Sequence, residues 1–181
     1  VKVFFKKHYN PSNAILCVAG NLELENVKEL VEKWYGSIPA GTKYERNLPK
    51  EPIQRELREL TIERNVPSNA FYYAFKMPDR LYPDFFTIDL LSDALGRDKS
   101  ARLYVTLKKE QQLVTDISAY ILGSLDEGLL VISGKLNEGI TFKQFDDALW
   151  SLIDELSANK LSDTELDRIM IKFRTAKEFQ E

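Results

Sequence analysis

The middle of the chain alternates apolar and polar residues, which is the pattern expected of strands that bury one face. Residues 55–65 and residues 70–77 both alternate, and the turn-forming sequence Val66-Pro67-Ser68 separates them. Two alternating runs joined by a short turn predict antiparallel neighbours in one sheet.

Three further segments are predicted to be strands. Residues 114–122 and 129–136 flank a turn at Asp126-Glu127-Gly128, and this arrangement predicts a β-hairpin. An apolar run over residues 14–19 lies between Asn13 and Gly20 and predicts a central strand.

Five other segments repeat apolar residues at the spacing of an amphipathic helix. Two of them open with a capping box, formed by Thr141 with Gln144 and by Ser162 with Glu165. Gly96 suits the end of another. The predicted helices cover residues 26–38, 83–96, 100–112, 141–156 and 162–173.

The order of these elements predicts an α+β fold, in which a mostly antiparallel β-sheet has helices packed on one face. Residues 39–54 contain three prolines and are interpreted as a surface loop rather than a domain linker, because residues 1–38 are too few to fold alone. We therefore expect a single domain over residues 1–181. Since the sequence starts at Val1 and ends in a helix-like run, we also expect a piece of a longer protein.

The composition narrows the classes of partner. The 181 residues are 44% apolar and 29% charged, as in an ordinary globular protein with a substantial core. The net charge is −3 with both signs interspersed, and no apolar run approaches the ~18 residues that span a bilayer. We expect no nucleic-acid partner and no membrane partner. The single cysteine, Cys17, is expected to pack as a small buried hydrophobe. The sequence does not assign the protein to a cellular compartment.

The residues offer little catalytic chemistry. Catalytic zinc usually needs three protein ligands rich in histidine, and this sequence holds one histidine, His8. Neither HxxEH nor HExxH occurs, so no zinc site is complete within these residues. No Ser–His–Asp triad, nucleophile elbow or glycine-rich phosphate loop can be identified either. We interpret His8 as a packing or capping residue.

Two other groups of side chains have a simple structural interpretation. The carboxylate pairs Asp146-Asp147 and Asp154-Glu155 lie on polar faces of predicted helices and are interpreted as solvated surface. Phe71, Tyr72, Tyr73 and Phe75 are not interleaved with basic residues, which favours a buried sheet face over a platform for nucleic-acid bases. From the residues alone, a binding or scaffolding domain is indicated rather than a self-sufficient enzyme.

Several segments together resemble one family. The pitrilysin/insulinase-type (M16) zinc peptidases have a second, metal-free unit, which resembles the run SARLYVTLKKEQQLVTDISAY followed by GLLVISGKLNEG. The segments HYNPSNAILCVAGNLELENV, WYGSIPAG and KLSDTELDR resemble other parts of that unit, in the same order along the chain. Within SARLYVTLKKEQQLVTDISAY and GLLVISGKLNEG, the residues that match the family's metal-free unit are Ser100, Arg102, Leu103, Leu107, Glu110, Leu113, Gly128 and Leu129.

The resemblance implies a metal-free, C-terminal-type domain with the α+β fold of these metallohydrolase units. In the family, another unit carries HxxEH and binds the zinc. The implied partners are that homologous zinc-bearing half, in the same chain or in a partner subunit, and a peptide substrate; a homodimer is a further option. A sheet edge can hold an extended peptide by backbone pairing. No cofactor is expected in this chain, and zinc is expected in the HxxEH half of the parent protein.

One feature of the family is missing. In some members a metal-free unit supplies an arginine and, seven residues later, a tyrosine that help hold substrate near the metal. The matching positions here are Lys108 and Thr115. Lysine cannot form the bidentate guanidinium fork, and threonine lacks the phenol. We therefore interpret Lys108 as plain surface and assign no catalytic, substrate-binding or metal-ligating residue.

Two functions remain under consideration. The leading hypothesis is a non-catalytic domain of an M16 zinc metallopeptidase, which helps to enclose and position peptide for the zinc-bearing half. The alternative is a structural or assembly subunit of the same fold without peptidase activity. A free-standing regulatory module is a weaker third hypothesis, because it requires the chain to be a complete protein.

Overall fold

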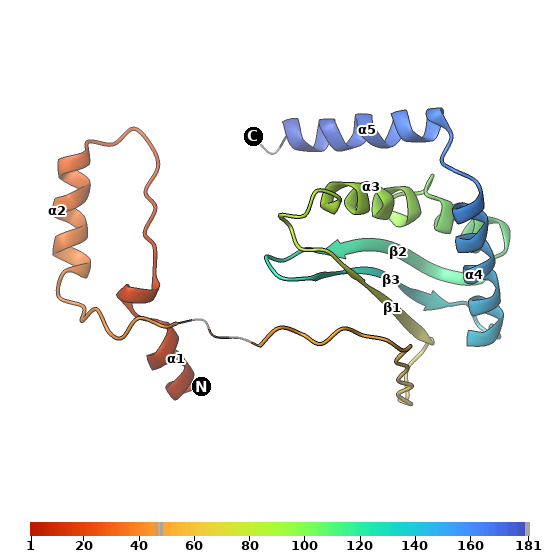
Figure 1. Cartoon of the computed structure of the whole chain (residues 1–181), viewed down its shortest axis with the longest axis horizontal. Coiled ribbons are helices and arrows are strands. Elements are labelled where there is room, and N and C mark those ends of the chain that lie inside the picture. Colours follow the sequence, from red (N-terminus) through yellow and green to blue (C-terminus); the bar gives the residue numbers. More distant parts are fainter. Residues whose placement is uncertain (46, 48, 180–181) are drawn as a thin grey trace. The chain divides into compact units, whose positions relative to one another are not determined.

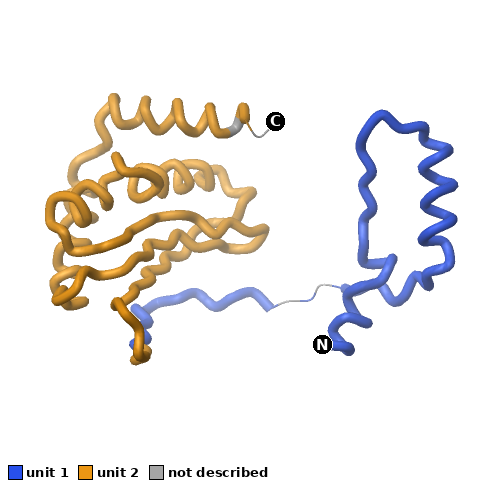
Figure 2. The backbone as a smooth tube through the Cα atoms, turned by 180° about the vertical axis from the view of Figure 1, so that it is seen from behind, with its two compact units in different colours: residues 1–61 blue, residues 62–181 orange. Residues whose placement is uncertain are grey.

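The computed structural model describes residues 1–45, 47 and 49–179. The chain divides into two compact units, residues 1–61 and residues 62–181 (Figures 1 and 2). Each unit is described by itself below. The expectation of one domain over residues 1–181 stays a prediction.

Unit 1 contains little regular structure. Its elements are helix α1 (Lys2–His8), a 3₁₀ turn η1 (Pro11–Asn13) and helix α2 (Leu24–Tyr35). The turn falls where Pro11 fixes the backbone, as the sequence indicates. Helix α2 begins two residues before the predicted cap at Asn26, with Glu23 at the N-cap position. No described residue of unit 1 is buried.

Two predicted strands do not form. Residues 14–19 and residues 55–65 have no regular secondary structure, and their apolar side chains are exposed; Ile15 is 92% exposed and Leu57 is 86% exposed. Alternation shows which side chains of a strand would share a face, but a strand also needs a neighbour for its backbone hydrogen bonds. The predicted pairing of residues 55–65 with residues 70–77 is therefore wrong.

Unit 2 is built on a three-stranded antiparallel sheet. Its strands are β1 (Ala70–Met77), β2 (Val114–Leu122) and β3 (Gly128–Leu136), in the order β1-β3-β2. The predicted hairpin of β2 and β3 is confirmed. Strand β1 pairs with β3 instead of with residues 55–65, and Tyr73 lies opposite Ile132.

The helices of unit 2 lie on one face of this sheet (Figure 1). They are α3 (Phe85–Gly96), the π-helical stretch η2 (Tyr104–Glu110), α4 (Phe142–Ala158) and α5 (Asp163–Glu178). Both predicted capping boxes form: in α4 the Thr141 hydroxyl accepts the backbone N–H of Gln144 at 3.2 Å, and Ser162 and Glu165 do the same for α5 at 3.3 Å. The α+β prediction, with helices on one face, is confirmed.

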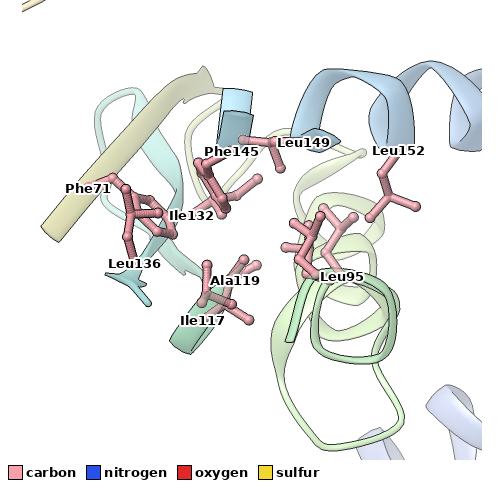
Figure 3. Close-up of a cluster of buried hydrophobic side chains, with 12 residues drawn as sticks. Phe71, Leu95, Ile117, Ala119, Ile132, Leu136, Phe145, Leu149 and Leu152 are labelled. Atoms are coloured by element: carbon pink, nitrogen blue, oxygen red, sulfur yellow. The ribbon is translucent and has the colours of Figure 1, made fainter. Parts of the chain in front are cut away.

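The core of unit 2 lies between the sheet and the helices (Figure 3). Phe145 of α4 is fully buried and packs against Phe71 of β1, with ring centroids 4.1 Å apart and the ring planes tilted by 30°. Leu103 and Leu107, before and within η2, are also fully buried. Each side chain of this size contributes about 1.5–3 kcal/mol when it leaves water, so this cluster is the main source of stability for unit 2.

Gly96 allows α3 to approach β2 very closely. A Cβ atom at Gly96 would lie 2.1 Å from the backbone nitrogen of Ala119 and 2.7 Å from the Ala119 Cβ. No side chain can be accommodated there, so the glycine that ends α3 also sets the distance between this helix and the sheet.

Candidate functional site

The segment from Gly96 to Gly139 carries most of the family-like residues, and its first part is fixed to α5. Both the backbone N–H and the hydroxyl of Ser100 donate to Asp98 Oδ1, at 2.7 and 2.5 Å. Lys172 of α5 donates to the other oxygen of Asp98. Partial burial opposes ionisation of Asp98, but the hydrogen bonds from Lys172 and Ser100 outweigh it and lower the pKa to about 2.

Arg102 forms a two-point ion pair with α5. Its Nε and Nη2 donate to Glu165 Oε1 and Oε2, each at 2.9 Å, and the two side chains are only 22% and 26% exposed. The hydrogen bond from Arg102 and the backbone N–H of Ser162 hold the pKa of Glu165 at about 2. The same bond raises the pKa of Arg102. A bidentate, charge-assisted pair thus joins the start of η2 to the start of α5.

The end of η2 is closed by backbone contacts. The N–H of Leu113 donates to the Leu107 carbonyl at 2.8 Å, and the Leu113 carbonyl accepts the N–H of Asn137 at 2.9 Å. Gln112, which directly precedes Leu113, has φ +53, a left-handed conformation that is unusual for a residue with a side chain. The Asn137 side chain donates to the Gln112 carbonyl at 2.5 Å and holds this conformation.

The hairpin residues of the pattern also have structural roles. A Cβ atom at Gly128 would lie 2.6 Å from the Leu122 carbonyl oxygen, so glycine is needed where β3 starts beside the end of β2. Together with the Arg102–Glu165 ion pair and the buried Leu103 and Leu107, this places most of the matched residues in contacts within or between η2, the hairpin and α5; Glu110 is exposed. They form a frame rather than a set of reactive groups.

Lys108 and Thr115 are the two positions that the family resemblance matches to an arginine and a tyrosine. Lys108 is half-buried, and its ammonium lies 5.1 Å from the centre of the Tyr104 ring, so the interpretation as plain surface is corrected to a cation–π contact. Thr115 is exposed on β2, and its hydroxyl donates to the Lys135 carbonyl at 3.3 Å.

His8 and Cys17 do not form a metal site. The His8 ring lies 4.5 Å from the rings of both Phe4 and Tyr44, which confirms a packing role. Cys17 is exposed, so the expectation of a buried thiol is wrong; the run around it has no strand partner to cover it. Among the described residues, no group of three or more His, Cys, Asp or Glu is placed to hold a metal.

The carboxylates of α4 are mostly solvated, as expected. Asp147, Asp154 and Glu155 are exposed. Asp146 differs, because it is half-buried and accepts a hydrogen bond from the Tyr73 hydroxyl of β1. An open cavity of about 520 Å³ lies between η2 and α4, and Asp147 and Glu155 contribute to its rim.

Within the described part of the chain, no helix is both long enough and apolar enough to cross a bilayer.

The sheet offers the backbone groups best suited to binding an extended chain. Because β3 is central, β1 and β2 each have an outer edge that pairs with no other strand among the described residues. The face opposite the helices carries Tyr72, 75% exposed, and Tyr120 and Leu122, also exposed. Val131 lies buried between them. Lys76, Ser118 and Ser133 lie on the same face, so only part of it is apolar. The two edges and the apolar part of this face are the candidate peptide-binding elements.

The chain belongs to the M16 peptidase family: residues 1–173 match the model of the peptidase M16 inactive domain. It is 25% identical over 176 residues to the zinc protease PqqE of Helicobacter pylori, covering 94% of this chain and 39% of that protein. It is 23% identical over 167 residues to the uncharacterized zinc protease YmxG of Bacillus subtilis, covering 92% of this chain and 40% of that protein. The chain therefore spans about two fifths of the length of these curated relatives.

Solved structures agree on the fold. The crystal structure of a protease from Helicobacter pylori matches with a TM-score of 0.82 and 26% identity, over 97% of this chain and 43% of that one. The M16 inactive domain from Pseudomonas fluorescens matches with a TM-score of 0.73 over 96% of this chain and 42% of that one; at 18% identity it supports the fold alone. The resemblance drawn from the sequence is confirmed.

Some of the contacts that hold this frame could have been anticipated. Arg102 lies in the SARL segment and Glu165 in the SDTEL segment, and both segments resemble the family. Their direct pairing was not predicted, although opposite charges in two family-like segments were a signal for it. The contacts of Lys172 with Asp98 and of Tyr73 with Asp146 had no comparable signal, because each joins residues more than 70 positions apart.

Proposed function

We propose that this chain is the non-catalytic half of an M16 zinc protease, and that it holds peptide substrate for a zinc-bearing half. The observation that supports this proposal is the match of residues 1–173 to the family's inactive domain. The names of the curated relatives point the same way, since both are called zinc proteases. The parent protein would then carry zinc on an HxxEH segment outside these residues.

The residues present do not fit a zinc ion. A catalytic zinc site needs about three protein ligands, and the single histidine packs between Phe4 and Tyr44. We therefore assign no step of peptide cleavage to this chain. Its own contribution is to bind and orient the substrate.

Backbone pairing at a free sheet edge would bind peptides with little sequence preference. An extended peptide placed beside β1 or β2 would exchange main-chain hydrogen bonds with that strand. The exposed apolar residues Tyr72, Tyr120 and Leu122 on the face opposite the helices would hold some of the peptide's side chains. Both contributions suit a protease that accepts unfolded chains.

Peptide binding by the parent protein in the presence of a chelator tests this role. An extended peptide is expected to bind, and the same peptide with alternate backbone nitrogens methylated is expected to bind at least about 10-fold more weakly, because it cannot pair with a strand edge. Equal affinity for the two peptides, or no binding of either, would contradict it.

A structural or assembly role is the second candidate. The resemblance favours it, because it matches Lys108 and Thr115 to an arginine and a tyrosine that hold substrate in some members of the family. Lys108 is engaged with Tyr104 and Thr115 with the Lys135 carbonyl. An HxxEH segment elsewhere in the parent sequence would favour the protease, and its absence from the parent would favour the assembly subunit.

A further inference from the structure

The cavity between η2 and α4 has an apolar base and polar walls. Leu152 of α4 is buried and Leu113 is half-buried, whereas Thr106 of η2 and Ser151 of α4 contribute hydroxyl groups. All of its lining residues belong to unit 2. At about 520 Å³ it is large enough for a small molecule with both apolar and polar parts.

Two carboxylates line this cavity, two helical turns apart. Asp147 and Glu155 are separated by eight positions on α4, which corresponds to about 12 Å along the helix axis. None of the described residues that line the cavity carries a positive charge. The cavity therefore favours a cation over an anion.

Both carboxylates are available to such a cation. Asp147 pairs with Lys143, but the two side chains are 68% and 83% exposed, and a surface pair of this kind is weak and easily exchanged. The carboxylate of Glu155 forms no hydrogen bond or ion pair with a described residue. It acts on Arg102 through charge alone, and the Arg102 guanidinium is already bound to Glu165.

The spacing of the carboxylates distinguishes an organic cation from a metal ion. Oxygen ligands lie within about 2.6 Å of a bound Ca²⁺, so a single ion cannot join carboxylates on residues two helical turns apart. Among the described residues no group is placed to hold a metal. An extended molecule with an ammonium group at each end can contact both carboxylates, while its methylene groups cover Leu113 and Leu152.

We propose that this cavity binds a linear polyamine, with its terminal ammonium groups at Asp147 and Glu155. Spermidine matches the spacing, because nine bonds place its terminal nitrogens roughly 11 Å apart when the molecule is extended. Its central amine would then lie between the walls, where the hydroxyl oxygens of Thr106 and Ser151 can accept its N–H groups. This site is independent of the proposed function.

Titration calorimetry of the 181-residue chain with spermidine tests the proposal. Saturable binding of one spermidine per chain is expected at low ionic strength, and no saturable binding at millimolar spermidine would overturn the proposal. Two diamines of equal charge test the spacing. The longer one, 1,8-diaminooctane, is expected to bind about 10-fold or more tightly than putrescine, which is too short to reach both carboxylates. Equal affinity for the two diamines would overturn the proposal.

Three variants separate the cavity from a general attraction to α4, which has four acidic residues and one basic residue. Glu155→Gln is expected to weaken spermidine binding by about 10-fold or more. Asp154→Asn is the matched control, because it removes the same charge from the adjacent exposed residue, which does not line the cavity; a change of less than about 2-fold is expected. Equal effects of these two variants would overturn the proposal.

The third variant, Ser151→Phe, fills the cavity and leaves every charge in place. It is expected to weaken spermidine binding by about 10-fold or more, and because Ser151 is exposed the fold should be kept. Circular dichroism of all three variants checks the fold. Spermidine binding that is unchanged in a folded Ser151→Phe variant would overturn the proposal.

Discussion

Arg102 and Glu165 join the two ends of the family-like region of unit 2. The guanidinium of Arg102 donates to both carboxylate oxygens of Glu165, each at 2.9 Å, although the residues are 63 positions apart. Glu165 also accepts the backbone N–H of Ser162 at 3.0 Å and so completes the N-terminal cap of α5. The Glu165 carboxylate therefore caps the N-terminus of α5 and also connects α5 to the residues at the start of η2.

Replacing Arg102 should destabilise unit 2. Arg102→Ala leaves a partly buried carboxylate without its cation, and we expect the free energy of unfolding to fall by about 2 kcal/mol. Arg102→Lys keeps the charge but loses the second parallel hydrogen bond, so a loss of about 1 kcal/mol is expected. Chemical denaturation of the chain measures both losses. Two variants as stable as the unmodified chain would show that the pair contributes nothing.

The Arg102–Glu165 pair should make the free energy of unfolding fall as the pH is lowered. The pKa of Glu165 is lowered from 4.5 to about 2 in the folded chain, so the unfolded chain takes up the proton first as the pH falls. The stabilisation is fully present above pH 4.5 and is lost between about pH 4.5 and 2. Glu165→Gln should therefore flatten the decline in unfolding free energy across this range.

Asp98 provides an internal reference for that experiment. Its pKa is also lowered, from 3.8 to about 2, and Glu165→Gln leaves its contacts with Ser100 and Lys172 in place. Some decline with acid should thus remain in the variant. An identical pH profile for Glu165→Gln and the unmodified chain would contradict the assignment of the acid sensitivity to Glu165.

Alanine at Gly96 should disrupt the contact between α3 and β2. The added methyl group would overlap backbone atoms of Ala119, and we expect a loss of about 3 kcal/mol in unfolding free energy. Gly139→Ala is the matched control, because φ is +80 there but nothing lies within 4 Å of the new Cβ. It should cost only the conformational strain, about 1 kcal/mol. Equal losses in the two variants would refute the steric explanation.

Glycine at position 112 should be tolerated or stabilising. Gln112 has φ +53, which costs a side-chain-bearing residue about 1–2 kcal/mol, whereas the greater freedom of glycine when unfolded costs about 0.5–1 kcal/mol. Gln112→Gly should therefore raise the unfolding free energy by about 0.5 kcal/mol. Gln112→Ala keeps the Cβ and should give no gain. A thermal melt in which the alanine variant is the more stable of the two would contradict this account.

Local structure in unit 2 was largely predictable from the sequence. The hairpin of β2 and β3, the helix end at Gly96 and both capping boxes depend on residues close together in the chain. The short spacing of these signals is why they could be identified. Tertiary pairing was harder, since alternation over residues 55–65 states which side chains share a face but not which strand lies beside them.

The candidate site was predictable only in part. The scarcity of metal-binding side chains follows from counting histidine and cysteine, and the family follows from short segments in order. The contact of Asp146 with Tyr73 depends on three-dimensional packing, and nothing in the spacing of these residues indicated it. The contact of Lys108 with Tyr104 could have been anticipated, because the two residues are four positions apart in a predicted helix. The exposure of Cys17 was missed because an apolar run was assumed to find a partner within this chain.

The location of zinc and cleavage activity tests the central claim most directly. Zinc content and peptide hydrolysis would be measured for the isolated 181-residue chain and for the full-length parent, with and without chelator. The account predicts stoichiometric zinc and chelator-sensitive cleavage in the parent, and neither in the isolated chain. Stoichiometric zinc or chelator-sensitive cleavage in the isolated chain would contradict it, and so would a parent that contains no zinc and cleaves no peptide.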